Sequence, residues 1–358
     1  MPCTGFDLDE HTRKGNRALK IFAGIDWAED HHDLAVVDDQ GHLLAKRRIA
    51  DDAAGFALLL QALAEAGDTP ADPIPIAIET SRGLLVACLR GTGREVYAIN
   101  PMAVSRYRDR HSVARRKSDA GDALVLANIL RTDADQHRPL PADSELAQAI
   151  AVLARAQQDA VWNRTQAHNK LRSHLREYYP AILEAFATER DGLLRPEARA
   201  ILAAAPTPAK AAQLTKPQLT ALLKQAGRKR ALAAETERLQ SIFRSHYLRQ
   251  PPLVEQALGH QAQALLAQLD AVCRAADDLE AATAEQFTRH PDAEIITSMP
   301  GVGPLIGARL LAEIGDDRTR FTDARALKAY AGSAPVTRAS GKTTTITHRR
   351  VKNQRLAA

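Results

Sequence analysis

Short apolar runs separated by polar turns mark the first third of the chain and predict a mixed sheet with helices packed on it. Three closely spaced runs come first, and strands and helices alternate after them. The predicted elements are, in chain order, strands at 21–26, 32–38 and 43–49, a helix at 53–66, a strand at 74–79, a helix at 84–91, a strand at 95–99, a helix from Pro101 and a helix at 118–130.

Apolar residues then recur at three- and four-residue steps between Leu146 and Tyr178, which predicts a long amphipathic helix. Several of its other positions are basic, and they form either a solvated polar face or a stripe that faces nucleic acid. A second helical block at 228–289 is interrupted at Pro251-Pro252. Long alanine-rich helices of this kind predict a helical hairpin or a coiled coil.

Residues 292–358 are rich in glycine and small polar residues, and the last ones, 348–358, look like the start of a helix. We therefore expect a shortened C-terminus. The expected regions are a flexible N-terminus at 1–19, an α/β domain at 20–140, a helical coiled-coil region at 141–290 and a C-terminal domain at 291–358.

The composition of the chain excludes several classes of protein. The 358 residues are 45% hydrophobic and 25% charged, which excludes wholesale disorder. No apolar run is long enough to span a membrane, and the N-terminus lacks the apolar core of a signal peptide, so we expect a cytoplasmic protein with no membrane partner. The three cysteines show no paired spacing that predicts a disulfide framework or a cysteine zinc site. A net charge of +5 is a weak indication of a polyanionic partner.

Four carboxylates stand at positions typical of a metal site. Asp26 ends the first predicted strand and Glu79 ends a later buried one, while Asp119 and Asp122 share one face near the start of a helix. Open α/β sheets bind ligands at the carboxyl ends of their strands, and oxygen ligands select Mg²⁺. Two such ions would hold a phosphodiester. Taken singly, each acid is as well explained as a turn residue or a helix cap.

The segment between Glu79 and Asp119 is strongly basic. Residues 106–117 contain six Arg or Lys and one acid, which is typical of phosphate neutralisation beside a site that cuts phosphodiesters. A surface loop with no partner is the alternative. The candidate nucleic-acid ligands in this segment are Arg106, Arg108, Arg115, Arg116 and Lys117.

Two motifs in the last region are also candidates for contact with nucleic acid. Gly301 and Gly303 lie between two apolar helical stretches, as in a helix-hairpin-helix whose backbone approaches a phosphate, or in a plain tight connection. Ser340 lies between Arg338 and Lys342. Its hydroxyl is either a nucleophile assisted by these cations or part of a turn, and Ser333 is a second candidate. The P-loop pattern GxxxxGK[ST] is absent.

These motifs, in this order, resemble the DEDD transposases of the IS110 family. The resemblance implies a RuvC-like domain of the ribonuclease H fold, a helical coiled-coil insertion and a mostly α C-terminal transposase domain. It also implies that Asp26, Glu79, Asp119 and Asp122 bind Mg²⁺ and that Ser340 is a nucleophile that links covalently to DNA. The matching stretches are Gly24-Ile25-Asp26, Ile78-Glu79-Thr80, Asn100-Pro101, residues 117–123, Pro300-Gly301-Val302-Gly303, residues 331–335 and Ser340-Gly341-Lys342.

The resemblance further implies a non-coding bridge RNA that pairs with donor and target DNA. It implies dimers that join into a tetramer, in which the serine of one protomer completes the carboxylate site of another, and a nucleoid-associated location in the cytoplasm. Three rivals stay open. They are a hydrolytic RuvC-like junction endonuclease, a decayed transposase that only binds nucleic acid, and a sugar-kinase-like ATPase, which the missing glycine-rich phosphate loops disfavour.

Overall fold

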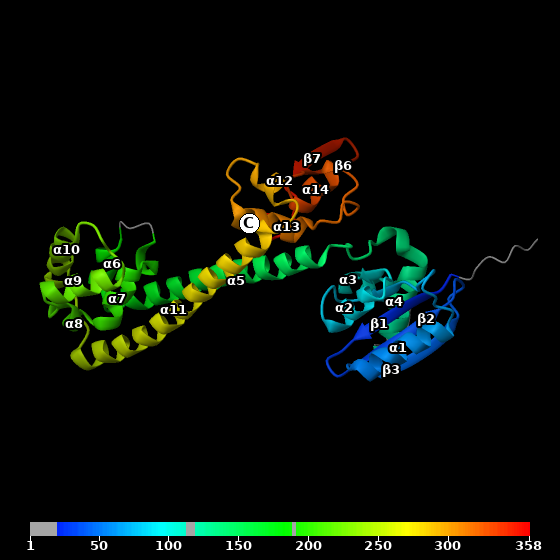
Figure 1. The fold of residues 1–358 in the computed structure, drawn as a ribbon, viewed down its shortest axis with the longest axis horizontal. Helices are drawn as coiled ribbons and strands as arrows, with labels where there is room; N and C mark the ends of the chain where they lie inside the picture. The colour runs from blue at the N-terminus through cyan, green and yellow to red at the C-terminus, as the bar shows by residue number, and fades with distance from the viewer. Residues whose placement is uncertain (1–19, 112–118, 188–190) are drawn as a thin grey trace, which may run out of the picture. The chain divides into compact units, whose positions relative to one another are not determined.

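The computed structural model describes residues 20–111, 119–187 and 191–358, without the side chains of His111, Asp119 and Ala120. The expected flexible N-terminus at 1–19 lies outside this part. The chain forms two compact units, Met1–Pro141 and Ala142–Ala358, which are described separately (Figure 1). In the described residues no helix is both long and apolar enough to cross a membrane.

The first unit is built on a mixed five-stranded sheet with the strand order β3-β2-β1-β4-β5. The first three strands form an antiparallel meander, and β4 pairs in parallel with both β1 and β5. The strands predicted from apolar runs are confirmed to within two residues at each end. Their bounds are β1 Phe22–Trp27, β2 His31–Val37, β3 Leu43–Ala50, β4 Ile76–Ile78 and β5 Val96–Ala98.

Helices cover both faces of this sheet because its central strands β1 and β4 are buried on both sides. Ile25 and Leu34 pack on one face with Leu59 and Leu89 of the first two helices. On the other face Ala77 packs with the last two helices, as part of a separate core. The four helices are α1 Ala53–Glu65, α2 Leu84–Gly91, α3 Pro101–His111 and α4 Asp119–Asp133.

A glycine allows α4 to lie directly on the central strand β1. A Cβ atom at Gly24 would overlap the carbonyl oxygen of Ala123 and the amide nitrogen of Ala127, both in α4. These are backbone atoms, which cannot rotate away as the end of a flexible side chain does. The close approach of α4 to β1 therefore requires glycine at position 24.

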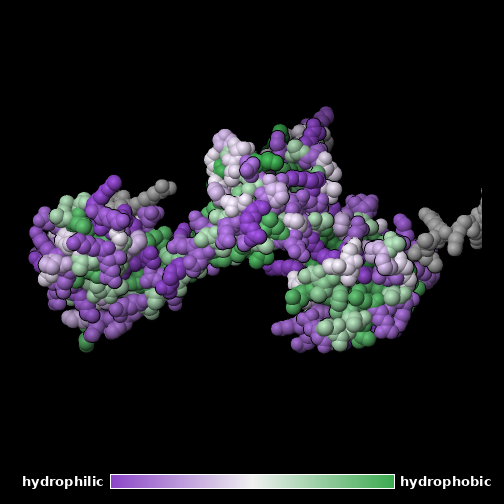
Figure 2. All heavy atoms as spheres, in the orientation of Figure 1, coloured by the Kyte–Doolittle hydropathy of each residue, from purple (hydrophilic) through white to green (hydrophobic). Residues whose placement is uncertain are grey.

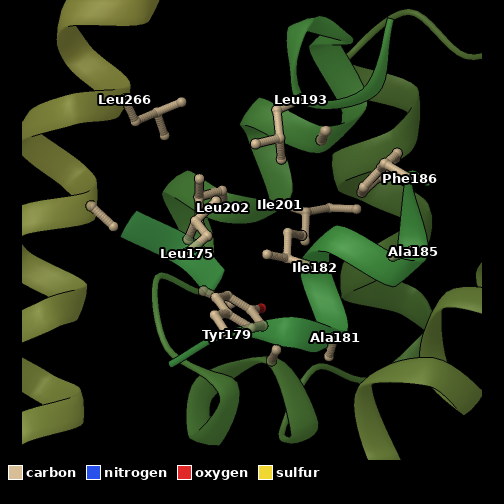
Figure 3. Close-up of a cluster of buried hydrophobic side chains, with 14 of the residues drawn as sticks. Leu175, Tyr179, Ala181, Ile182, Ala185, Phe186, Leu193, Ile201, Leu202 and Leu266 are labelled. Atoms are coloured by element: carbon tan, nitrogen blue, oxygen red, sulfur yellow. The ribbon is translucent and has the colours of Figure 1, made fainter. Parts of the chain in front are cut away.

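The second unit is built on two long helices, α5 Glu145–Arg176 and α11 Pro252–Thr288, which pack along each other as the predicted helical hairpin (Figure 1). The segment between them folds into a small helical domain, residues 177–250, that we call the helical head. Its core contains Tyr179 and Ile182 and extends to Leu266 of α11 (Figure 3). The head's elements are α6 Pro180–Ala185, η2 Gly192–Leu194, α7 Pro196–Ala204, α8 Pro208–Ala212, α9 Lys216–Gln225 and α10 Leu232–Arg244.

The other end of the helical pair carries the C-terminal residues. Ile150 of α5, Phe287 of α11 and Leu311 form a small apolar core there. One expectation fails in this region, because residues 348–358 contain turns rather than the start of a helix. Ser340 lies in a β-hairpin that the sequence analysis did not identify. The elements are α12 Ala293–Thr297, α13 Pro304–Ile314, α14 Ala324–Ala331, β6 Val336–Ser340 and β7 Thr343–Thr347.

Two buried glutamates of the head are surrounded by arginines. Arg195 binds Glu197 with two hydrogen bonds, and Arg238 binds Glu235 in the same way. Arg228 lies between the two acids, 3.7 Å from Glu197 and 3.6 Å from Glu235. The hydrogen bonds from Arg238 hold the pKa of the Glu235 carboxyl below its ordinary value of 4.5, against the opposing effect of burial.

Replacing Gly24 with alanine tests the approach of α4 to β1. We expect Gly24→Ala to lower the free energy of unfolding by about 3 kcal/mol or more, because backbone must move to admit the methyl group. Gly91→Ala is the matched control, since no heavy atom lies within 4 Å of a Cβ there. Denaturant unfolding of both variants gives the comparison, and equal stability of the two would contradict the packing.

The pKa of Glu235 makes the stability of the head depend on pH. Because its carboxyl has a lowered pKa in the folded protein, the ionised form stabilises the fold above 4.5, and this contribution is lost as the pH falls below that value. We expect Glu235→Gln to lower the free energy of unfolding at pH 7 by roughly 1–3 kcal/mol. The difference from wild type should shrink at pH 3.5.

The control for this variant is Glu237→Gln, which removes an exposed carboxylate from the same helix. We expect a change of less than about 0.5 kcal/mol at either pH. A pH-independent effect of Glu235→Gln would show that packing, and not ionisation, explains the loss of stability.

Candidate active site

Asp26 and Glu79 lie at the same edge of the sheet. Strands β1 and β4 are parallel, and Ile25 pairs with Ile78, so the two acids follow one step further along neighbouring strands. Alternate residues of a strand point to the same side, which places Asp26 on the face of Gly24, the face that α4 covers. Both acids are half-buried.

The start of α4 brings Asp122 to this edge. Ala123, the next residue, contacts Gly24 two positions before Asp26 in β1. The other end of α4 lies at the opposite edge, where Leu130 and Phe22 line one pocket. The helix therefore runs antiparallel to β1, and its first turn lies near the carboxyl ends of the strands. Asp119 begins the same helix, but its side chain lies outside the described part.

Asp122 is only 5% exposed and is paired with a cation. Nη2 of Arg108, in α3, donates a hydrogen bond of 2.6 Å to its Oδ1 atom. Burying a carboxylate without a partner costs several kcal/mol, and this arginine offsets part of that cost.

The sequence analysis did not identify one further acid on this face of the sheet. Asp33 of β2 pairs directly with Asp26 in the strand register and is 3% exposed. Its carboxylate accepts two hydrogen bonds from Arg48, at 2.8 and 3.3 Å, and Arg48 is in turn its register partner on β3. The only sequence signal was an acid inside an otherwise apolar strand. Arg48, Asp33, Asp26 and Glu79 thus form one polar row across four strands.

The structure brings part of the predicted metal set to one face and edge. Among the side chains it describes, no three His, Cys, Asp or Glu residues are arranged to hold a metal ion. A shared ion at Asp26, Glu79, Asp119 and Asp122 therefore stays a prediction, which rests on the strand register and on the acidic donor set.

The predicted basic ligands near this edge differ in what they contact. Arg106 is exposed, whereas Arg108 is engaged with Asp122. Arg110, which was not among the predicted ligands, lies 3.6 Å from Asp133 at the other end of α4. Arg115, Arg116 and Lys117 lie outside the described residues, so their contact with nucleic acid stays a prediction.

Ser340 stands at the tip of the hairpin of β6 and β7. It pairs with Thr343 across a two-residue turn in which Gly341 has a φ of +56°. The side chain is exposed, and its hydroxyl has no hydrogen-bond partner in the described part of the chain. Arg338, two residues earlier, and Lys342, in the turn, are exposed as well. The hydroxyl and two cations are therefore open to a large substrate.

Ser333, the second candidate nucleophile, has a structural role. Its hydroxyl donates a 3.2 Å hydrogen bond to the carbonyl oxygen of Lys328 at the end of α14. The preceding residue, Gly332, has a φ of +82° and ends that helix. Ser333 thus satisfies a carbonyl at the end of a helix, which favours Ser340 as the reactive serine.

The two glycines of the third candidate motif lie in an open turn between α12 and α13. Gly301 has a φ of +80°, and no atom lies within 4 Å of a Cβ built at Gly301 or at Gly303. Gly303 precedes the 11-residue helix α13 without a capping side chain. Backbone amides in this position suit a phosphate, and binding there stays a prediction.

The segment after the hairpin is fastened to α5 by buried polar contacts that the sequence analysis did not find. Glu313, 4% exposed, accepts hydrogen bonds from Arg155 at 2.7 and 3.2 Å and from Asn353 at 2.6 Å. Arg355 binds Asp159 at 2.8 and 3.0 Å and stacks over Trp162. These contacts join the segment after the hairpin to α5 and α13.

Two sequence families match the chain. The IS110-type family of DEDD transposases matches residues 23–180, and the family described as "Transposase IS116/IS110/IS902" matches residues 293–357. The first contains the polar row and the second contains the serine hairpin. Residues 181–292, with most of the helical head, lie outside both ranges.

Three relatives are similar over large parts of the chain. A Streptomyces coelicolor protein named as a transposase for the mini-circle IS117 is 67% identical over 95% of this chain and 82% of its own length. A Sinorhizobium fredii protein named as a transposase, y4uE, is 33% identical over 57% of this chain and 56% of its own. The 42 kDa protein of insertion element IS900 from Mycobacterium paratuberculosis is 30% identical over 91% and 79%. This chain belongs to the IS110 family of insertion-sequence transposases.

Proposed function

We propose that this transposase cuts and rejoins DNA through a covalent link to Ser340, at a Mg²⁺-binding cluster formed by Asp26, Glu79, Asp119 and Asp122. The polar row across the sheet is the observation that carries the proposal. Asp26 and Glu79 each follow the paired residues Ile25 and Ile78 of the parallel strands β1 and β4, with the first turn of α4 at the same edge. Oxygen ligands in such a group suit Mg²⁺.

The ions would supply charge stabilisation at the phosphodiester, and two of them fit a donor set of four carboxylates. Asp122 is already paired with Arg108, so a metal ion would share this carboxylate with the guanidinium or displace it. Arg48 pairs with Asp33, which keeps this acid out of the proposed ligand set. The strand register and the acidic donor set support the metal assignment.

In the proposed reaction the Ser340 oxygen attacks a DNA phosphorus. A bond from serine oxygen to phosphorus forms, the bond from phosphorus to one deoxyribose oxygen breaks, and the serine proton is transferred in net to that oxygen. The hydroxyl of another DNA end then attacks the phosphoserine, joins the strands and restores the serine hydroxyl. The number of phosphoester bonds is conserved, so the exchange needs no added energy source. Arg338 and Lys342 lie where they would neutralise the phosphate.

The proposal extends to the partners. A non-coding bridge RNA would select donor and target DNA, and dimers joined into a tetramer would let the serine of one protomer act at the carboxylates of another. The exposed hairpin supports this arrangement, because Ser340 and its neighbours are accessible to DNA and to a second protomer. The glycine turn before α13 would contact backbone phosphates in the manner of a helix-hairpin-helix.

Replacing the two serines separately tests the nucleophile. We expect Ser340→Ala to abolish the covalent protein–DNA adduct and to slow strand exchange by on the order of 10³-fold or more. Ser333→Ala, which removes only a helix-capping hydroxyl, should retain the adduct. Labelled donor DNA on a denaturing gel shows the adduct directly. DNA cleavage by Ser340→Ala at the wild-type rate would instead identify a hydrolytic nuclease.

Metal affinity tests the carboxylate cluster. We expect Glu79→Gln to weaken Mg²⁺ or Mn²⁺ binding at least roughly tenfold, measured by titration calorimetry, because a charged ligand becomes a neutral one. The control is Glu95→Gln, which changes an exposed acid at the amino end of β5, and it should bind metal like wild type. Identical affinities of both variants would refute a site at Glu79.

A further inference from the structure

The helical head carries a concentrated positive charge. Residues 177–250 contain twelve Arg or Lys and seven Asp or Glu, so this fifth of the chain has a net charge of +5, equal to that of the whole protein. Within it, residues 198–234 contain no acid at all. The seven basic residues of that stretch are Arg199, Lys210, Lys216, Lys224, Arg228, Lys229 and Arg230.

Several of these cations already have carboxylate partners. Arg199 pairs with Asp270 of α11, Lys216 pairs with Glu237, and Arg228 lies between the two buried glutamates of the head. Lys224, Lys229 and Arg230 are different. They are exposed, and in the described part of the chain none of them has an ion pair or a side-chain hydrogen bond.

Lys229 and Arg230 lie in the turn that follows α9, residues 227–231, which we call the basic turn, and Lys224 lies in the last turn of α9. Gly227 has a φ of +91°, and Ala231 has a φ of +52°, a conformation that residues with a side chain rarely adopt. Arg228 points inward and donates a 3.3 Å hydrogen bond to the carbonyl oxygen of Arg230. The turn is thus fixed from inside by Arg228, while Lys229 and Arg230 are left to solvent.

The fixed turn sits on a well-packed domain. Leu219 and Leu223 of α9 are fully buried in the core of the head, so the exposed face of the helix end has a rigid support. Hydrophilic residues cover much of the visible surface of the head (Figure 2). The head therefore presents exposed cations without carboxylate partners on a well-packed domain. Such a surface suits the phosphate backbone of a nucleic acid.

The head is held far from the terminal core that carries the serine hairpin. Its core includes Leu265 and Leu269 of α11, whereas Phe287 belongs to the other core, near the end of the same helix. Leu269 and Phe287 are 18 residues apart in α11, which corresponds to about 27 Å at 1.5 Å per residue. That separation corresponds to roughly 8 base pairs of duplex DNA at 3.4 Å each.

We propose that Lys224, Lys229 and Arg230 bind the phosphate backbone of duplex DNA outside the segment that is cut. The inference rests on the proposed function only for the identity of the nucleic acid, since the family acts on DNA. Lysine and exposed arginine side chains contact phosphates without reading bases, so binding is independent of sequence. The surface holds flanking DNA while the chemistry takes place elsewhere.

The experiment measures binding alone. A 40-base-pair duplex without any sequence of the element is titrated with full-length protein at several salt concentrations, and fluorescence anisotropy gives the affinity. We expect the triple variant Lys224→Gln/Lys229→Gln/Arg230→Gln to bind at least roughly tenfold more weakly at 0.15 M salt. The slope of log affinity against log salt should fall by about three, one for each lost phosphate contact.

A matched pair of single variants controls for the loss of charge as such. Lys229→Gln and Lys216→Gln each remove one positive charge from the surface of the head, but Lys216 is already paired with Glu237. We expect Lys229→Gln to weaken binding and Lys216→Gln to change it less than twofold. Thermal unfolding of each variant should match wild type, because all four side chains are exposed.

Two results would overturn the proposal. One is an unchanged affinity and salt slope in the triple variant, and the other is a loss confined to a 40-base-pair RNA duplex, which would assign the surface to RNA. The proposed function is tested separately, by formation of the Ser340 adduct on short DNA. A triple variant that forms the adduct but loses duplex affinity supports the flanking contact, whatever the guide molecule is.

Discussion

The contact of α4 with β1 is the constraint on which the candidate active site depends. Gly24 lets the helix backbone lie against the central strand, and this contact determines the position of the first turn of α4. Because the helix runs antiparallel to the strand, Asp122 comes to the edge that Asp26 and Glu79 share. A side chain at position 24 would displace the helix, and with it one acid relative to the other two.

Buried carboxylates paired with arginines recur throughout the protein. Asp33 with Arg48, Asp122 with Arg108 and Glu313 with Arg155 each combine a nearly buried acid with a more exposed guanidinium. Such pairs contribute little net stability, but breaking one leaves an uncompensated charge that costs several kcal/mol. Instead, these pairs fix the relative positions of the elements that they join, at the edge of the sheet and between α5 and α13.

Elements with a strong apolar period could be predicted from the sequence, and those governed by long-range contacts could not. The strands of the first unit and the long helices α5 and α11 follow from local patterns. The core of the head joins residues from Leu171 to Cys273, and no window of sequence reveals such a pairing. The hairpin of Ser340 was missed because its strands are exposed on both faces, which removes the alternation that predicts a strand.

The candidate site was predictable in part for the same reason. Asp26 and Glu79 stand at strand ends, where a pattern reveals them, whereas Asp33 lies inside a largely apolar strand and is identified only by its register with Asp26.

The most direct test of the account is anomalous scattering from crystals of the full-length protein grown with Mn²⁺. The account predicts a metal peak bonded to carboxylate oxygens of Asp26, Glu79 and Asp122, and carboxylates too far apart to share an ion would contradict it.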